Sequence, residues 1–270
     1  MDTMGEPMTT CYDVFAACVA AIDNNELIQV VSAKDKEFHF QNWFQQRLHH
    51  LGLNYDDPGR NTYPDFRLVN VPEGYEIKGL QTPGRDKNYD SNSQIPTGLH
   101  RGRTIFYVFG RYPKERIGRE YPVIDLVICH GDFLNVDHEY IHKNKSIRGF
   151  GSYGDIMIRD RKMYVVPTPF ALTDGTVGTK TLILPEHTLP DPRFTAVGAL
   201  TRVETRDLVV GYTFDLRTNS LTNETVPNPN AGREHRFIAY RLTTQHGKPV
   251  RMATHTPDDL FMMMDLDEDP

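Results

Sequence analysis

The hydrophobic pattern divides the chain into a helical beginning and a longer, strand-rich remainder. Apolar residues recur at helical spacing between positions 12 and 22, and again between positions 40 and 51. Both stretches predict amphipathic helices, the second beginning near Ser32 and running to Leu51, where Gly52 ends it. From residue 57 onward, short apolar runs are separated by Gly, Pro, Asn and Asp, which is typical of strands joined by turns. The predicted strands cover residues 65–70, 75–81, 104–110, 122–129, 155–159, 162–167, 180–184, 197–203, 208–214 and 235–242.

The stretch PDFRLVNVPEGYEIKG, residues 64–79, predicts two short strands with a turn near Pro72. Alternate residues of a strand face the same side, so Glu76 and Lys78 share one face. A turn at Pro72 brings Asp65 opposite Gly79, within about one residue of Lys78. Two carboxylates that meet repel each other unless a hard cation lies between them, and oxygen ligands suit Mg²⁺. This set fits phosphodiester hydrolysis, in which lysine serves the attacking water; the alternative is a solvated charged hairpin.

Composition is that of an ordinary soluble globular protein, with 270 residues, 39% apolar and 24% charged. Three cysteines without a C-x2-C pair argue against a disulfide framework or a cysteine zinc site. The longest apolar stretch, VFAACVAAI at 14–22, is too short to span a bilayer and follows acidic rather than basic residues. We therefore expect a cytoplasmic protein without a membrane anchor.

Charge is distributed unevenly along the chain. Residues 258–270 contain six of the 36 acids and no base, so the remaining 30 acids balance the 30 bases. Residues 78–103 hold five bases against two acids, a local charge of +3, and residues 141–162 hold six against two, a local charge of +4. Basic stretches of this size can contact phosphates, although a solvated face has the same composition.

The Pro-Asp pair at Asp65, followed by the EIK triplet at Glu76 and Lys78, resembles the signature of the PD-(D/E)xK nuclease superfamily, and within it type II restriction endonucleases. The resemblance spans about residues 32–110. It implies an α/β (mixed α+β) fold with a central mixed β-sheet flanked by helices, Mg²⁺-dependent cleavage of double-stranded DNA, and a homodimer. It also implies that Asp65 and Glu76 bind the metal, that Lys78 handles the water, and that Glu37 is an additional metal ligand. A salt-bridged acid at a helix start explains Glu37 as well. The family usually has a helix after the second motif strand, whereas residues 80–103 predict a loop.

Two other groups of residues compete with this site. The segment HEYIH matches the H-E-x-x-H zinc signature, with His138 and His142 as ligands and Glu139 as general base. It is followed by charged and polar residues and lies on no long apolar helix, so a polar surface turn is the stronger interpretation. A second acid and lysine set, Asp155 with Asp160 and Lys162, falls on a predicted turn where charges are expected anyway. The sequence contains none of the G-x-S-x-G, G-x4-G-K-[ST] or G-x-G-x-x-G motifs.

Candidate DNA contacts lie in two basic segments. The loop at 81–103 joins basic residues to amide and hydroxyl side chains, which can read base edges and phosphates. The segment KNKSIRGFGSYG at 143–154 offers phosphate contacts. The candidates are Arg85, Lys87, Asn92, Ser93, Gln94, Arg101, Arg103, Lys143, Lys145 and Arg148.

Together these observations predict a Mg²⁺-dependent, sequence-specific endonuclease that acts on double-stranded DNA, a type II site-specific deoxyribonuclease. The alternatives are a non-catalytic β-rich DNA-binding or interaction module and, less favoured, an HExxH zinc metalloprotease. The predicted parts are an N-terminal helical segment (1–56), a nuclease core with a restriction-endonuclease-like arrangement (57–170), a β-rich C-terminal part (171–257) and an acidic tail (258–270).

Overall fold

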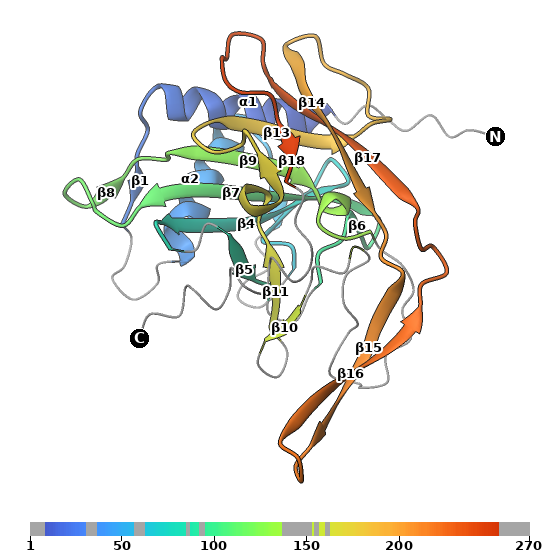
Figure 1. The fold of residues 1–270 in the computed structure, drawn as a ribbon. Coiled ribbons are helices and arrows are strands. Elements are labelled where there is room, and N and C mark those ends of the chain that lie inside the picture. The colour runs from blue at the N-terminus through green and yellow to red at the C-terminus, as the bar shows by residue number, and fades with distance from the viewer. Residues whose placement is uncertain are drawn as a thin grey trace.

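The computed structural model shows a mixed α+β fold in which strands outnumber helices (Figure 1). Two long helices, α1 (Thr9–Asp23) and α2 (Glu37–His50), precede most of the strands, as the apolar periodicity predicts. Within the part of the chain that is described, no helix combines the length and apolar character needed to cross a membrane. The structure describes residues 9–30, 37–56, 63–84, 87–91, 95–136, 153, 157–159 and 163–253.

A large mixed sheet forms the centre of the molecule, with strand order β14-β17-β13-β9-β7-β4-β3-β2 and β6 paired to β7. The β4–β7 and β9–β13 pairs are parallel and the other pairs are antiparallel. Strands from both the predicted nuclease core and the predicted C-terminal part therefore share one sheet. Its strands are β2 (Tyr55–Asp56), β3 (Phe66–Leu68), β4 (Glu73–Thr82), β6 (Leu99–His100), β7 (Arg103–Pro113), β9 (Asp125–His130), β13 (Lys180–Pro185), β14 (Phe194–Val203) and β17 (Glu234–Leu242).

Smaller elements surround this sheet. A three-stranded sheet has the order β10-β11-β5, and the pairs β1–β8, β12–β18 and β15–β16 form two-stranded sheets. The bounds of these elements are β1 (Ile28–Gln29), β5 (Asn88–Asp90), β8 (Glu120–Tyr121), β10 (Met157–Arg159), η1 (Gly131–Phe133), β11 (Met163–Pro167), α3 (Pro169–Leu172), β12 (Thr173–Asp174), β15 (Asp207–Asp215), β16 (Ser220–Pro227) and β18 (Arg251–Met252).

Each face of the large sheet packs against its own hydrophobic cluster. On one face, Phe40 and Phe44 of α2 join α1 and the inward residues Tyr75 and Ile77 of β4. On the other face, Leu80 and Tyr107 pack with Tyr89 of β5 and with residues near α3. Strands β7 and β9 are buried along nearly their whole length because both faces of the sheet are covered there. The faces of β4 therefore differ: Tyr75 and Ile77 point to the helices, and Glu76 and Lys78 point away from them.

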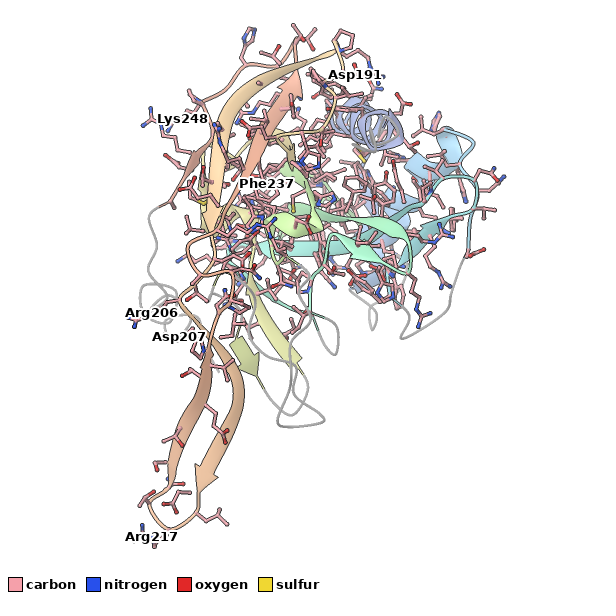
Figure 2. The ribbon with its side chains drawn as sticks, turned by 90° about the vertical axis from the view of Figure 1, so that its right-hand side faces the viewer. Asp191, Arg206, Asp207, Arg217, Phe237 and Lys248 are labelled. Carbon is pink, nitrogen blue, oxygen red and sulfur yellow. The ribbon has the colours of Figure 1, made fainter. Side chains whose placement is uncertain are left out.

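The antiparallel pair β15–β16 forms an arm that projects from the body as a continuation of β14 and β17 (Figure 2). Arg206 and Asp207 mark its base and Arg217 lies at its tip. A buried carboxylate, that of Glu204, ties the base together, with His235 Nε2 at 2.8 Å from Oε1 and Asn228 Nδ2 donating to Oε2 at 3.1 Å. A two-stranded ribbon alone is only marginally stable in water. The hydrogen bonds of Glu204 therefore stabilise the arm at the point where it joins the main sheet.

A second buried carboxylate, that of Glu73, lies near the start of α1. Its Oε2 accepts a hydrogen bond from the Tyr75 hydroxyl at 2.7 Å, and the backbone N–H of Cys11 also donates to this carboxylate. Burial raises the pKa of Glu73 from 4.5 to about 7. The folded protein therefore favours the protonated carboxyl, and the stability associated with it is fully present below about pH 4.5 and is lost as the pH rises through about 7.

Glu73→Gln is expected to stabilise the protein at pH 8 by up to about 3 kcal/mol and to change stability little at pH 4.5, because glutamine keeps the acceptor without the buried charge. Urea unfolding at the two pH values measures the difference. The exposed Glu115→Gln serves as the control and should behave like the wild type at both. An equal effect of Glu73→Gln at the two pH values would contradict the titration of this group.

Candidate active site

The β3–β4 pair places Asp65 beside the strand that carries Glu76. Phe66 pairs with Tyr75, so continuing the antiparallel ladder places Asp65 opposite Glu76. The Pro72-centred register that places Asp65 opposite Gly79 is therefore wrong, because the reversal centres on residues 70 and 71. Asp65 Oδ2 accepts a hydrogen bond from the Ile77 backbone N–H at 2.7 Å. The aspartate is thus held against the middle of the motif strand.

Glu76 and Lys78 form a close ion pair on the face of β4 that points away from the helices. Lys78 Nζ lies 2.7 Å from Glu76 Oε1, and the two side chains are only 14% and 13% exposed. The other carboxylate oxygen, Glu76 Oε2, is buried and has no hydrogen-bond partner among the described residues. A buried carboxylate oxygen without a donor is energetically costly, so this atom has the capacity to bind a further donor or a cation.

Three tyrosines line the surroundings of this pair. Tyr107 on β7 is the parallel-strand neighbour of Glu76, and its hydroxyl lies 2.9 Å from that of Tyr63. Burial raises the pKa of Tyr107 well above its ordinary value, and smaller contributions come from the neighbouring Tyr63, Tyr89 and Glu76. The Tyr107 hydroxyl therefore keeps its proton. The Lys78 ammonium also lies 5.7 Å from the centre of the Tyr89 ring, within the range of a cation–π contact. The ammonium is therefore held between a carboxylate and an aromatic face.

The residues present fit a Mg²⁺ site of the water-rich kind. No group of three or more His, Cys, Asp or Glu side chains in the described ranges is arranged to hold a metal ion. Mg²⁺ commonly binds through one or two carboxylates and completes its shell with water and substrate phosphate. Asp65 and Glu76 could supply those carboxylates, and Glu76 Oε2 is the orphaned atom that such an ion would satisfy.

The predicted DNA contacts that are described take different positions. Arg101 is exposed in the two-residue turn between β6 and β7, with φ of 50°, followed by Gly102 with φ of 77°. Arg103 instead donates from Nη1 to the carbonyl oxygens of Leu68, at 2.5 Å, and Val71, at 3.2 Å. Arg103 therefore braces the β3–β4 turn, which leaves Arg101 as the better candidate for a base contact. Lys87 lies directly before β5 and is half-buried.

The loop predicted after the motif strand contains β5 and β6, and its described residues form no helix before β7. A contact between the His100 and Tyr63 rings, 5.0 Å apart, connects the β6–β7 turn to the tyrosines beside Glu76. The turn that presents Arg101 is thus continuous with the candidate site.

Several predicted residues lie outside the described residues. Glu37 is the first residue of α2, and its side chain is not described. The start of that helix near Ser32, both competing motifs and the acidic tail also fall outside. The other residues in this group are Arg85, Asn92, Ser93, Gln94, His138, Glu139, His142, Lys143, Lys145, Arg148, Asp155, Asp160 and Lys162.

The tyrosines are the site residues that sequence reasoning missed. Tyr107 stands in the apolar run RTIFYVFG, where alternation along a fully buried strand gives no signal for a polar neighbour. Tyr63, directly before the Pro-Asp pair, could have been flagged by that position alone.

Comparison of the sequence with protein-family models finds no match, and none of the curated proteins matches it either.

Proposed function

We propose that the protein is a Mg²⁺-dependent, sequence-specific endonuclease of double-stranded DNA, with a restriction-endonuclease-like core, that acts as a homodimer. The observation that carries the proposal is the combination at Glu76: one oxygen is paired with Lys78, the other is buried without a hydrogen-bond partner among the described residues, and Asp65 is bonded to the neighbouring Ile77 N–H. This grouping is what the resemblance of the motif to PD-(D/E)xK nucleases implies.

Each residue would contribute a separate part of the chemistry. Asp65 and Glu76 would hold Mg²⁺, which when bound neutralises charge that develops on the scissile phosphate and makes a water more acidic. Asp65 is oriented for this by its hydrogen bond from Ile77 N, which fixes one carboxylate oxygen. The Lys78 ammonium, released from Glu76 when that carboxylate turns to a cation, would orient the attacking water, or would accept its proton after first losing one to solvent.

The tyrosines would keep this region rigid. Tyr107 keeps its phenolic proton because burial raises its pKa, so its contact with Tyr63 involves neutral hydroxyl groups. A site braced in this way needs little reorganisation when charge develops. The neutral body of the chain, with 30 acids and 30 bases outside residues 258–270, suits an enzyme that must release unrelated DNA.

The test is incubation of the purified protein with phage DNA in Mg²⁺, in Ca²⁺ and in EDTA. We expect discrete fragments in Mg²⁺ and none in EDTA, because sequence-specific cleavage gives a fixed set of products. Binding to labelled duplex in Ca²⁺ is the second readout, and it is expected to be tighter than in EDTA. Binding that is unchanged by divalent ions, without cleavage, would favour the non-catalytic DNA-binding module.

A further inference from the structure

A polar cavity at the β13 and β17 ends of the sheet has no part in the proposed nuclease chemistry. It has a volume of about 240 Å³. Figure 2 shows Lys248, which follows this region in the chain, at the end of the molecule away from the arm. The cavity is lined by Asp23, Gly178, Thr179, Lys180, Arg241, Thr244, Gln245 and His246.

The central feature of this cavity is Arg241, a buried cation that is only 1% exposed. Its guanidinium donates to neutral acceptors: the carbonyl oxygens of Gly175 and, at 2.8 Å, Lys248, and the hydroxyls of Thr179 and Thr181, each at 3.3 Å. No carboxylate among the described residues pairs with it, and burial lowers the pKa of Arg241. A buried charge that is hydrogen-bonded but has no counter-charge is costly, and a bound anion would relieve that cost.

The remaining charges of the cavity leave an excess of positive charge. Lys180 Nζ pairs with Asp23 Oδ1 at 2.5 Å, so these two charges cancel and that of Arg241 is left over. The Asp23 side chain is 55% exposed, which makes this ion pair weak and exchangeable. Lys180 can therefore turn toward an anion in the cavity at little cost.

An amide with unused hydrogen-bonding capacity lines the same cavity. Both Gln245 Oε1 and Gln245 Nε2 are buried and have no partner in the described part of the chain. A buried amide in this state calls for a ligand or an ordered water, because an unmade hydrogen bond costs more than a made one gains. The hydroxyl of Thr244 lines the cavity as a further donor, whereas that of Thr179 already donates to the Thr176 carbonyl oxygen at 2.9 Å.

We propose that this cavity binds a phosphate group, with Arg241 and Lys180 supplying the charge and Gln245 Nε2 a hydrogen bond. A phosphate has charge and several acceptor oxygens, and so can use donors that converge from more than one loop. The proposal does not rest on the nuclease function.

The source of the phosphate is either a free anion or nucleotide, or the backbone of a nucleic acid. Residue pairings connect the carboxyl end of β4 to this cavity: Leu80 with Arg111, Arg111 with Asp125, and Leu126 with Lys180. These three strand-to-strand steps span about 14 Å across the sheet. One duplex could therefore contact both regions, so the experiment must separate the two sources.

Calorimetric titration with inorganic phosphate, at constant ionic strength, tests the site. The wild type should bind one phosphate per chain with saturation, and Lys180→Gln and Gln245→Ala should each weaken binding by about fivefold or more, the equivalent of about 1 kcal/mol. Lys114→Gln, an exposed lysine elsewhere, is the matched control and should bind like the wild type. Arg241→Lys keeps the charge but not the fork of donors and should also weaken binding; a melting curve without phosphate shows whether each variant is folded.

A parallel titration with a DNA duplex in Ca²⁺ distinguishes the sources. If Lys180→Gln weakens both ligands and phosphate competes with the duplex, the site holds a backbone phosphate. If it weakens phosphate binding alone, the ligand is a free anion or a nucleotide. Absence of saturable phosphate binding to the wild type up to about 10 mM, or equal affinity of folded Lys180→Gln and Gln245→Ala for phosphate, would overturn the proposal.

Discussion

Glu76→Gln is expected to lower the rate of DNA cleavage by about a thousandfold, the scale on which removal of one electrostatic group from a preorganised site acts. The change keeps the size of the side chain and removes the negative charge that a cation needs. Asp65→Asn should have a loss of similar size, because both carboxylates serve the same ion. The measurement is conversion of supercoiled plasmid to nicked and linear forms in Mg²⁺.

Lys78→Ala tests whether the lysine has a different role from the two carboxylates, in the same assay. It should also abolish cleavage, but it should still bind DNA in Ca²⁺ because the lysine serves the water rather than the phosphate contacts. The exposed Glu115→Gln, outside the site, is the control and should cut at the wild-type rate. Wild-type cleavage by both folded carboxylate variants would show that this grouping is not the active site.

Asp125→Ala is expected to destabilise the protein by about 3 to 5 kcal/mol, because it removes the carboxylate that pairs with the buried Arg111. The two side chains are 0% and 7% exposed and meet through two hydrogen bonds, Nε to Oδ1 at 2.8 Å and Nη2 to Oδ2 at 2.6 Å. Asp125 Oδ2 also accepts the Gly178 N–H at 2.6 Å, so the same change frees a loop at the start of β13. Urea unfolding measures the loss.

Two further variants test the cause of that loss. The double variant Arg111→Met with Asp125→Leu should recover much of the stability, since apolar residues of similar size can replace a buried ion pair without leaving a charge buried. Glu186→Ala, which breaks the exposed pair with Arg236, should cost less than about 1 kcal/mol. If the double variant is no more stable than Asp125→Ala, the loss of the carboxylate partner of Arg111 is not the source of the instability.

Sequence patterns predicted most of the secondary structure because the strongest signals were local. The apolar stripe from Tyr12 to Ile22 became α1, and the predicted strands at 75–81 and 104–110 became the long strands β4 and β7. The strand β16 was missed because SLTNETVP is polar and lacks a strand-like alternation with apolar residues. β16 is a strand because it pairs with β15 along the whole hairpin, and a short stretch of sequence does not show this pairing.

The geometry of the candidate site was less predictable than the side chains that share a face of its strand. The spacing predicted Asp65, Glu76 and Lys78 as site residues, and strand periodicity predicted that Glu76 and Lys78 share one face, which their ion pair confirms. The predicted pairing partner of Asp65 was three residues too far along β4. The position of the turn sets the register, and the prediction placed the turn at Pro72 instead of at residues 70 and 71. The tyrosines and the role of Arg103 depend on neighbouring strands and could not be inferred from local sequence.

The order of strands in the large sheet has a consequence for synthesis of the chain on the ribosome. β9 pairs on one side with β7, which is made earlier, and on the other side with β13, which begins fifty residues after β9 ends. Until those residues emerge, the apolar β9 presents an open edge of backbone donors and acceptors, the kind of edge that pairs with other chains. β13 in turn pairs with β17, so the sheet is completed only after residue 242 has been made. A chain released before β13 is made would therefore expose the unpaired edge of β9. Keeping β9 away from other nascent chains during this interval would protect against aggregation.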